Sequence, residues 1–149
     1  MKDAARLLLV EDSETQVFLV NTIITTIPEL DIVEVVEDGE KALAYLRREH
    51  PYQQAACPDL VLLDINMPKK NGFEVLAEMK ADPTLKQLPV VMLTTSSSQA
   101  DIDLAYKSGA SGFITKPVGF DELRQVLEAF ANYWSSAVEL PSSTFNLSP

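Results

Sequence analysis

Short apolar runs alternate with amphipathic stretches along the whole chain. Their length, their bounding turn residues and their near-continuous hydrophobicity are typical of strands buried on both faces of a sheet. One run, at 31–36, alternates more than the others, which indicates a position nearer to a sheet edge. The runs that we interpret as strands are 7–10, 31–36, 59–63, 90–93 and 112–115.

The stretches between the runs carry apolar residues at helical spacing. Ser13 and Glu14 supply a cap and an acidic first turn for the first of them. Pro83 ends the third helix soon after residue 81, and Gly109 ends the fourth. The helices that the spacing predicts are 13–27, 38–49, 72–81, 99–107 and 119–136.

Five strand–helix pairs in succession predict an α/β fold, in which a doubly wound, five-stranded parallel sheet has helices on both faces. The common strand order for such a sheet is 2-1-3-4-5, and its ligand crevice opens between strands 1 and 3. We expect one domain over residues 1–136 and a tail over 137–149, because we find no linker and no segment for an output domain.

Composition narrows the classes of function. With 149 residues, 46% of them hydrophobic, the chain can bury one core. A formal net charge of -10 argues against nucleic-acid binding and against anionic membranes. The single Cys57 permits no intrachain disulfide, and the single His50 argues against a histidine-based catalytic site. Without a signal peptide or an apolar run of about 18 residues, the sequence predicts a cytoplasmic protein.

Polar side chains follow the predicted strands at the points where they end. Glu11 and Asp12 follow the first strand, Asp64 the third, Thr94 the fourth and Lys116 the fifth. Because the carboxyl ends of parallel strands meet at one edge, these residues are expected to converge on the crevice. Carboxylates held close together repel one another unless a cation sits among them, and oxygen ligands suit Mg²⁺.

The lysine and the threonine at the strand ends indicate that the site also binds a phosphoryl group. Lys116 offers a positive charge to a phosphate oxygen, and Thr94 offers a hydroxyl. An aspartate can be the nucleophile of phosphoryl transfer, forming an acyl phosphate. Taken singly, such residues are more often helix caps or turns, so the inference depends on all of them falling at strand ends in order.

The motifs LLLVED, LVLLDINMPKKNG, PVVMLTT and GASGFITKP resemble the receiver domains of two-component response regulators, over residues 6–134. The resemblance implies a stand-alone signalling protein rather than an enzyme, with a histidine kinase as phosphodonor and turnover limited to its own phosphorylation and dephosphorylation. Asp64 would be the phosphoacceptor. Asp12, Asp64 and the backbone carbonyl of Asn66 would ligate Mg²⁺, and Glu11, the other acid of the pair, would belong to the metal site and reach the ion through water.

The resemblance also implies a switch. Thr94 would move toward the phosphoryl group that Lys116 contacts, and Phe113 would be the aromatic that changes place. Three residues depart from the commonest family pattern. Glu11 is longer than aspartate, Phe113 lacks the tyrosine hydroxyl, and Thr95 is bulkier than usual and could narrow access to Asp64. The signal would leave through the surface of helix 4, strand 5 and helix 5 toward a downstream protein that the sequence does not identify.

A finer resemblance concerns three segments: RREHPYQQAACPDLVLLD, ADPTLKQLPVVMLTTSS and YWSSAVELP. Together they are similar to the single-domain regulators that pair with phytochrome-type histidine kinases. This resemblance implies a photoreceptor kinase as partner.

The last predicted helix carries one apolar stripe that ends in an aromatic pair, Tyr133 and Trp134. Large aromatics at a helix tip favour interfaces, so we expect a homodimer through a face that includes Phe130, Tyr133 and Trp134. The alternative is that Val138 and Leu140 of the tail fold back and cover Trp134.

Three other functions stay open. A small Mg²⁺-dependent phosphatase could use an aspartyl nucleophile, although Asn66 provides no acid two residues after Asp64. A flavodoxin-like cofactor module would need a phosphate-binding loop where the acidic EDSETQ stands. An inactive receiver could serve only as a docking surface, although the complete set of acids, hydroxyl and lysine argues against this.

Overall fold

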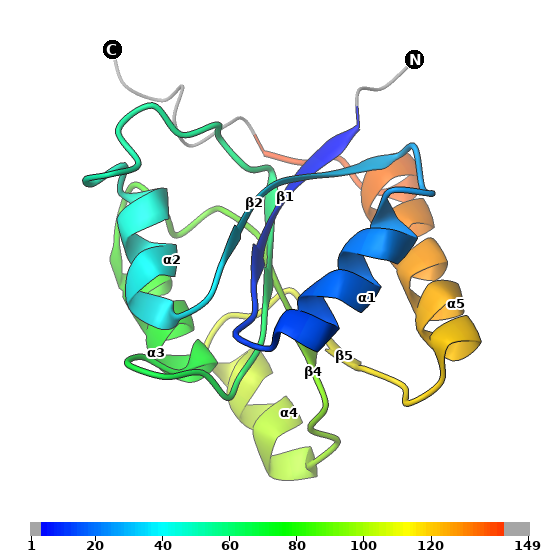
Figure 1. The fold of residues 1–149 in the computed structure, drawn as a ribbon. Helices are drawn as coiled ribbons and strands as arrows, with labels where there is room; N and C mark the ends of the chain where they lie inside the picture. The colour runs from blue at the N-terminus through cyan, green and yellow to red at the C-terminus, as the bar shows by residue number, and fades with distance from the viewer. Residues whose placement is uncertain (1–3, 142–149) are drawn as a thin grey trace.

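A computed structural model of the chain describes residues 4–141. Its five strands form one parallel sheet with the order β2-β1-β3-β4-β5, which confirms the predicted fold class (Figure 1). The strand that alternates most, β2, lies at an edge, as its sequence indicated. The strands are β1 (Ala5–Val10), β2 (Leu30–Val36), β3 (Leu60–Leu63), β4 (Val90–Thr94) and β5 (Gly112–Thr115).

Helices cover both faces of the sheet, with α1 and α5 on one side and α2, α3 and α4 on the other (Figure 1). No helix within residues 4–141 is both long and apolar enough to cross a membrane. The helices are α1 (Glu14–Ile24), α2 (Gly39–Leu46), α3 (Gly72–Ala81), α4 (Gln99–Lys107) and α5 (Phe120–Ala131), and a π-helical segment, η1 (Asn132–Ala137), extends the last of them.

Two helices end earlier than the periodicity predicted. Helix α1 ends at Ile24 because the hydroxyls of Thr25 and Thr26 bond back to carbonyls of the preceding turn, at 2.8 and 2.6 Å, and Pro28 follows. Helix α2 ends at Leu46, and Arg48 beyond it takes a positive φ of 56°. Side-chain bonds and backbone reversals of this kind leave no trace in hydrophobic spacing.

Two apolar cores, one on each face, hold the sheet between the helix layers. Alternate residues of β1 point into different cores, with Leu8 and Val10 toward α2 and α3, and Leu7 and Leu9 toward α1 and α5. All four are at most 2% exposed. Since the central strands are buried on both faces, their carboxyl ends are fixed points from which the polar residues project.

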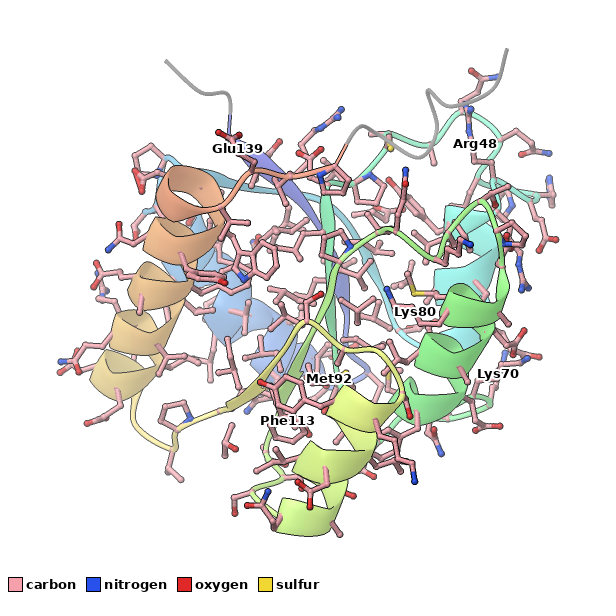
Figure 2. The ribbon with its side chains drawn as sticks, turned by 180° about the vertical axis from the view of Figure 1, so that it is seen from behind. Arg48, Lys70, Lys80, Met92, Phe113 and Glu139 are labelled. Carbon is pink, nitrogen blue, oxygen red and sulfur yellow. The ribbon has the colours of Figure 1, made fainter. Side chains whose placement is uncertain are left out.

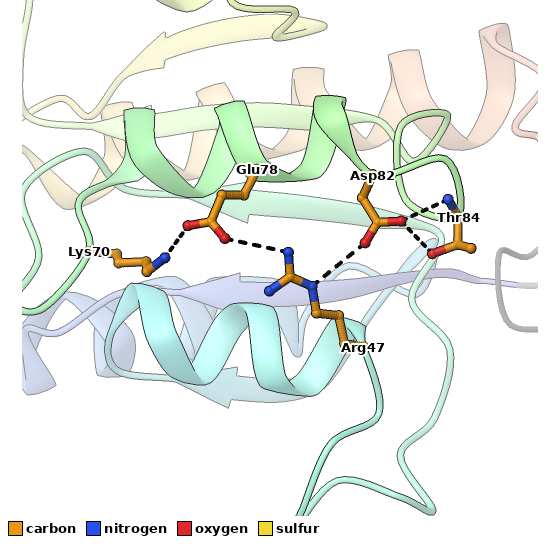
Figure 3. Close-up of polar contacts among 5 residues, drawn as sticks. All are labelled: Arg47, Lys70, Glu78, Asp82 and Thr84. Atoms are coloured by element: carbon orange, nitrogen blue, oxygen red, sulfur yellow. Dashed lines mark hydrogen bonds and ion pairs between the residues drawn. The ribbon is translucent and has the colours of Figure 1, made fainter.

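Ion pairs on the surface join α2 to α3 beside the core (Figure 3). Arg47 lies between two acids of α3 and its C-cap, 3.4 Å from Glu78 and 3.6 Å from Asp82. Glu78 also pairs with Lys70, in the loop that leads into α3, and the hydrogen bond from the Lys70 ammonium lowers the pKa of Glu78. The exposed position of these charges limits each pair to a small stabilisation, but together they tie that loop to the helix layer.

Candidate functional site

Three carboxylates meet at the carboxyl end of the sheet. Glu11 and Asp12 follow β1, Asp64 follows β3, and the two strands are neighbours with Val10 opposite Leu63. One oxygen from each carboxylate lies within 4.8 Å of the others. The parallel topology therefore brings together acids that stand more than fifty positions apart in the sequence.

The three acids differ in exposure. Glu11 and Asp64 are 4% and 9% exposed, whereas Asp12 faces solvent. One Asp64 oxygen, Oδ1, accepts a hydrogen bond from the Ile65 backbone N–H at 2.8 Å, which fixes the carboxylate plane. A set of hard oxygen donors with one open side fits Mg²⁺, because that ion prefers oxygen ligands and keeps several of its waters.

Lys116 reaches the same pole from the end of β5. Its ammonium forms a buried ion pair with Glu11 Oε1, and the two side chains are 3% and 4% exposed. The other Glu11 oxygen accepts the Ser13 backbone N–H at 3.1 Å. Burial raises the pKa of Glu11, with the Asp64 charge acting in the same direction and Lys116 opposing both. Lys116 is thus a counter-ion of the acidic site, and its pairing with Glu11 is a contact that the sequence did not predict.

Thr94 is the last residue of β4 and its side chain is fully buried. Its hydroxyl oxygen accepts the Ser96 backbone N–H at 3.4 Å, and its carbonyl accepts the Lys116 backbone N–H at 2.6 Å. Thr95, the next residue, is exposed. The β4–α4 loop therefore begins at a hydroxyl that already has a partner inside the protein.

Phe113 lies in β5 opposite Met92 of β4. It is half-buried and packs against the core on the α2–α3–α4 side, and Figure 2 shows it beside Met92 near α4. A ring on this face, without a hydroxyl to bond, is held by packing alone.

Asn66 is exposed in the β3–α3 loop, just beyond Asp64. This loop folds back tightly, since the Gly72 N–H bonds to the Ile65 carbonyl at 2.8 Å and a Cβ on Gly72 would lie 2.3 Å from the Asp64 carbonyl oxygen. Glycine is therefore required here by close backbone approach.

Asp38 braces the same loop from α2. It is 3% exposed, caps α2 through the Lys41 N–H at 2.8 Å, and lies 3.9 Å from the Lys69 ammonium. The sequence analysis missed this support, although an Asp–Gly pair at a helix start is a recognisable cap signal.

The three residues expected at a dimer face differ in their exposure to solvent. Phe130 and Trp134 are only 5% and 9% exposed and belong to the core cluster on the α1–α5 side, against which Val138 and Leu140 also pack. Tyr133 alone is open, at 56%, with its ring edge-on to Trp134 at 5.3 Å. The burial of Trp134 is consistent with the alternative of a folded-back tail. Residues 142–149 of the expected tail lie outside the described part of the chain.

The family model of the response regulator receiver domain matches residues 7–128. Response regulator Rcp1 of Synechocystis sp. is 36% identical over 137 residues, which cover 92% of this chain and 93% of Rcp1.

Two solved structures resemble the whole described fold. The phosphorylated cyanobacterial phytochrome response regulator RcpA has a TM-score of 0.86 and 41% identity, covering 93% of this chain and 99% of that one. The Mn²⁺-bound form of Rcp1 has a TM-score of 0.84 and 37% identity, with the same coverage.

The cluster of Glu11, Asp12 and Asp64, the acidic triad, leads to a prediction about metal binding. Asp12→Asn and Asp64→Asn should each weaken the affinity for Mg²⁺ by roughly tenfold or more, because each removes a charged oxygen ligand. Titration calorimetry with MgCl₂ measures this directly. Glu128→Gln removes an exposed acid of α5, away from the triad, and should bind Mg²⁺ like the wild type. Equal affinity in all four proteins would show that the triad is not the metal site.

Proposed function

The chain belongs to the response regulator receiver domain family, and on this premise we propose that Asp64 accepts a phosphoryl group from a histidine kinase at a site that holds Mg²⁺. One observation carries the proposal: one carboxylate oxygen from each of Glu11, Asp12 and Asp64 lies within 4.8 Å of the other two, at the same pole as the buried Lys116 ammonium. An anion needs such positive charge to approach three acids. As a signalling protein, the chain would turn over only its own acyl phosphate.

In the proposed transfer, an Asp64 carboxylate oxygen attacks the phosphorus of a phosphohistidine. The new O–P bond forms as the P–N bond breaks, and the leaving imidazole keeps the electron pair and takes up a proton. Bound by Asp12, Asp64 and the Asn66 carbonyl, Mg²⁺ would neutralise charge on the phosphoryl oxygens. Lys116 would exchange Glu11 for a phosphoryl oxygen, which its flexible stem permits.

The signal would then pass through Thr94 and Phe113. The Thr94 hydroxyl would turn to the phosphoryl group, and Phe113 would move into the space beside it, changing the surface of α4, β5 and α5. Such a local charge event biases a two-state element and is read elsewhere on the molecule. Contact with a downstream protein would carry the signal on, and we propose the cytoplasm as the compartment.

We also propose a phytochrome-type histidine kinase as the phosphodonor. The support is that RcpA, 41% identical along nearly its whole length, is described as a cyanobacterial phytochrome response regulator.

Phosphotransfer tests both parts of this proposal. With Mg²⁺, the wild type should gain one phosphoryl group from a small phosphodonor and from a phosphorylated phytochrome-type kinase, and Asp64→Asn should gain none from either. Intact-mass spectrometry follows the gain. Asp59→Asn is the matched control, because Asp59 precedes β3 at the opposite end of the strand and bonds to Arg6.

The arms of this experiment separate the two claims. Phosphorylation by the small donor, but equally slow transfer from the phytochrome-type kinase and from an unrelated histidine kinase, would reject the photoreceptor partner alone. Phosphorylation of Asp64→Asn would reject Asp64 as the acceptor.

We further propose a homodimer through the surface of β5 and the helices beside it. A hollow of about 390 Å³ lies there, lined by Phe113, Ile114 and Phe130 and flanked by Tyr106 and Tyr133, which are 52% and 56% exposed. Exposed tyrosines around an apolar hollow are favoured at protein interfaces.

Sedimentation velocity over a concentration series tests the dimer. Tyr133→Ala should raise the dimer dissociation constant by roughly tenfold, the loss expected at an interface anchor. Phe18→Ala removes a 69% exposed aromatic from α1, which contributes no residue to the hollow, and should leave dimerisation unchanged. A wild type that stays monomeric at high concentration, with and without phosphorylation, would contradict the proposal.

A further inference from the structure

The β4–α4 loop, residues 95–98, is held by side chains at both ends. At the β5 end, the Thr115 hydroxyl donates to the Ser96 carbonyl at 2.9 Å. At the α4 end, the Ser96 hydroxyl donates to the Asp101 carboxylate at 2.7 Å, and the Ser98 N–H donates to the Ser96 hydroxyl oxygen at 3.3 Å. Ser96 is therefore held by hydrogen bonds to both its backbone carbonyl and its side-chain hydroxyl.

Ser96 is also hydrogen-bonded to Thr94. The Ser96 N–H donates to the Thr94 hydroxyl oxygen, but at 3.4 Å, which is long for such a bond. The two bonds that hold Ser96 from outside are shorter and lie within the ordinary range. The position of the Ser96 amide, and with it the partner of the Thr94 hydroxyl, thus depends on Thr115 and Asp101 more than on Thr94 itself.

Thr115 also lies next to the residues of the proposed switch, Thr94 and Phe113. Phe113 packs in the core on the α4 side of the sheet, while Ile114 packs in the opposite core. Because side chains alternate along a strand, Thr115 shares the face of Phe113. It pairs with Thr94 across the two strands and directly precedes Lys116.

We propose that Thr115, with Asp101, is a latch that keeps the Thr94 hydroxyl on the Ser96 amide in the unphosphorylated protein. The inference rests on the proposed phosphorylation of Asp64, since release of the latch is what would free Thr94 for the phosphoryl group. Thr115 is a positioning residue, because it acts on the reacting group only through Ser96. Loss of the hydrogen bond from Thr115 to Ser96 favours the arrangement in which Asp64 accepts a phosphoryl group.

Three variants test the latch. Thr115→Val keeps the shape and removes the hydroxyl, so it leaves the Ser96 carbonyl without this donor and destabilises the unphosphorylated arrangement. Its Mg²⁺-dependent phosphorylation by acetyl phosphate should be roughly fivefold faster, the change expected when one hydrogen bond of ordinary strength is lost from the starting state. Thr115→Ser restores the hydroxyl and should react within twofold of the wild type.

Thr26→Val is the matched control, because it also removes a hydroxyl that donates to a backbone carbonyl, at the end of α1. It should leave the phosphorylation rate unchanged. A rate in Thr115→Val equal to or below that of the wild type, or an equal gain in Thr26→Val, would overturn the latch.

Hydrogen exchange gives a second readout that needs no phosphate. The Ser96 amide should exchange several-fold faster in Thr115→Val than in the wild type, Thr115→Ser or Thr26→Val. An unchanged Ser96 rate overturns the latch even where Asp64 is phosphorylated normally. A wild type that takes up no phosphoryl group rejects the proposed function instead, and the exchange rates then decide whether the loop is held as inferred.

Discussion

Mutual repulsion among Glu11, Asp12 and Asp64 is the constraint around which this molecule is arranged. One oxygen from each carboxylate lies within 4.8 Å of the other two, and two of the three side chains are almost fully buried. Charges at that separation destabilise a fold unless positive charge offsets them. Lys116 supplies part of it through its buried pair with Glu11. The negative charge that Lys116 does not offset favours binding of a cation. A bound cation would in turn allow an anionic phosphoryl group to approach.

The rest of the fold keeps these charges where they are. Apolar cores on both faces fix the strand ends, and the β3–α3 loop is closed by Gly72 and braced by Asp38 and Lys69. The β4–α4 loop, in contrast, depends on a few hydrogen bonds to Ser96. The side of the site that carries the three acids is therefore held by packing and by close backbone contacts, whereas the side that carries Thr94 is held by a few hydrogen bonds. The proposed metal binding and Thr94 switch would need this division.

The sequence predicted whatever depends on periodicity and topology. The strands, their order, the edge position of β2 and the meeting of residues 11, 12 and 64 all follow from runs of apolar residues and from parallel connections. It could not predict contacts that depend on side-chain direction. The ion pair between Lys116 and Glu11 is one such contact, and the prediction that Lys116 contacts a phosphoryl oxygen stays a prediction. Trp134 was expected at an exposed helix tip, but it is only 9% exposed and belongs to the core cluster against which Val138 and Leu140 pack. The bond from Thr115 to Ser96 likewise requires the register of β5 against β4.

The unfolding free energy of Asp64→Asn relative to the wild type, measured by urea denaturation in EDTA and again in saturating Mg²⁺, tests the account most directly. Asparagine keeps an oxygen acceptor for the Ile65 N–H, removes the charge and replaces the second carboxylate oxygen by an NH₂ group of similar size. If repulsion governs the site, the variant is more stable than the wild type in EDTA, by about 1–2 kcal/mol, and this advantage disappears or reverses when Mg²⁺ binds the wild type. A variant that is no more stable than the wild type without the metal, or whose difference from the wild type does not change with Mg²⁺, would contradict it.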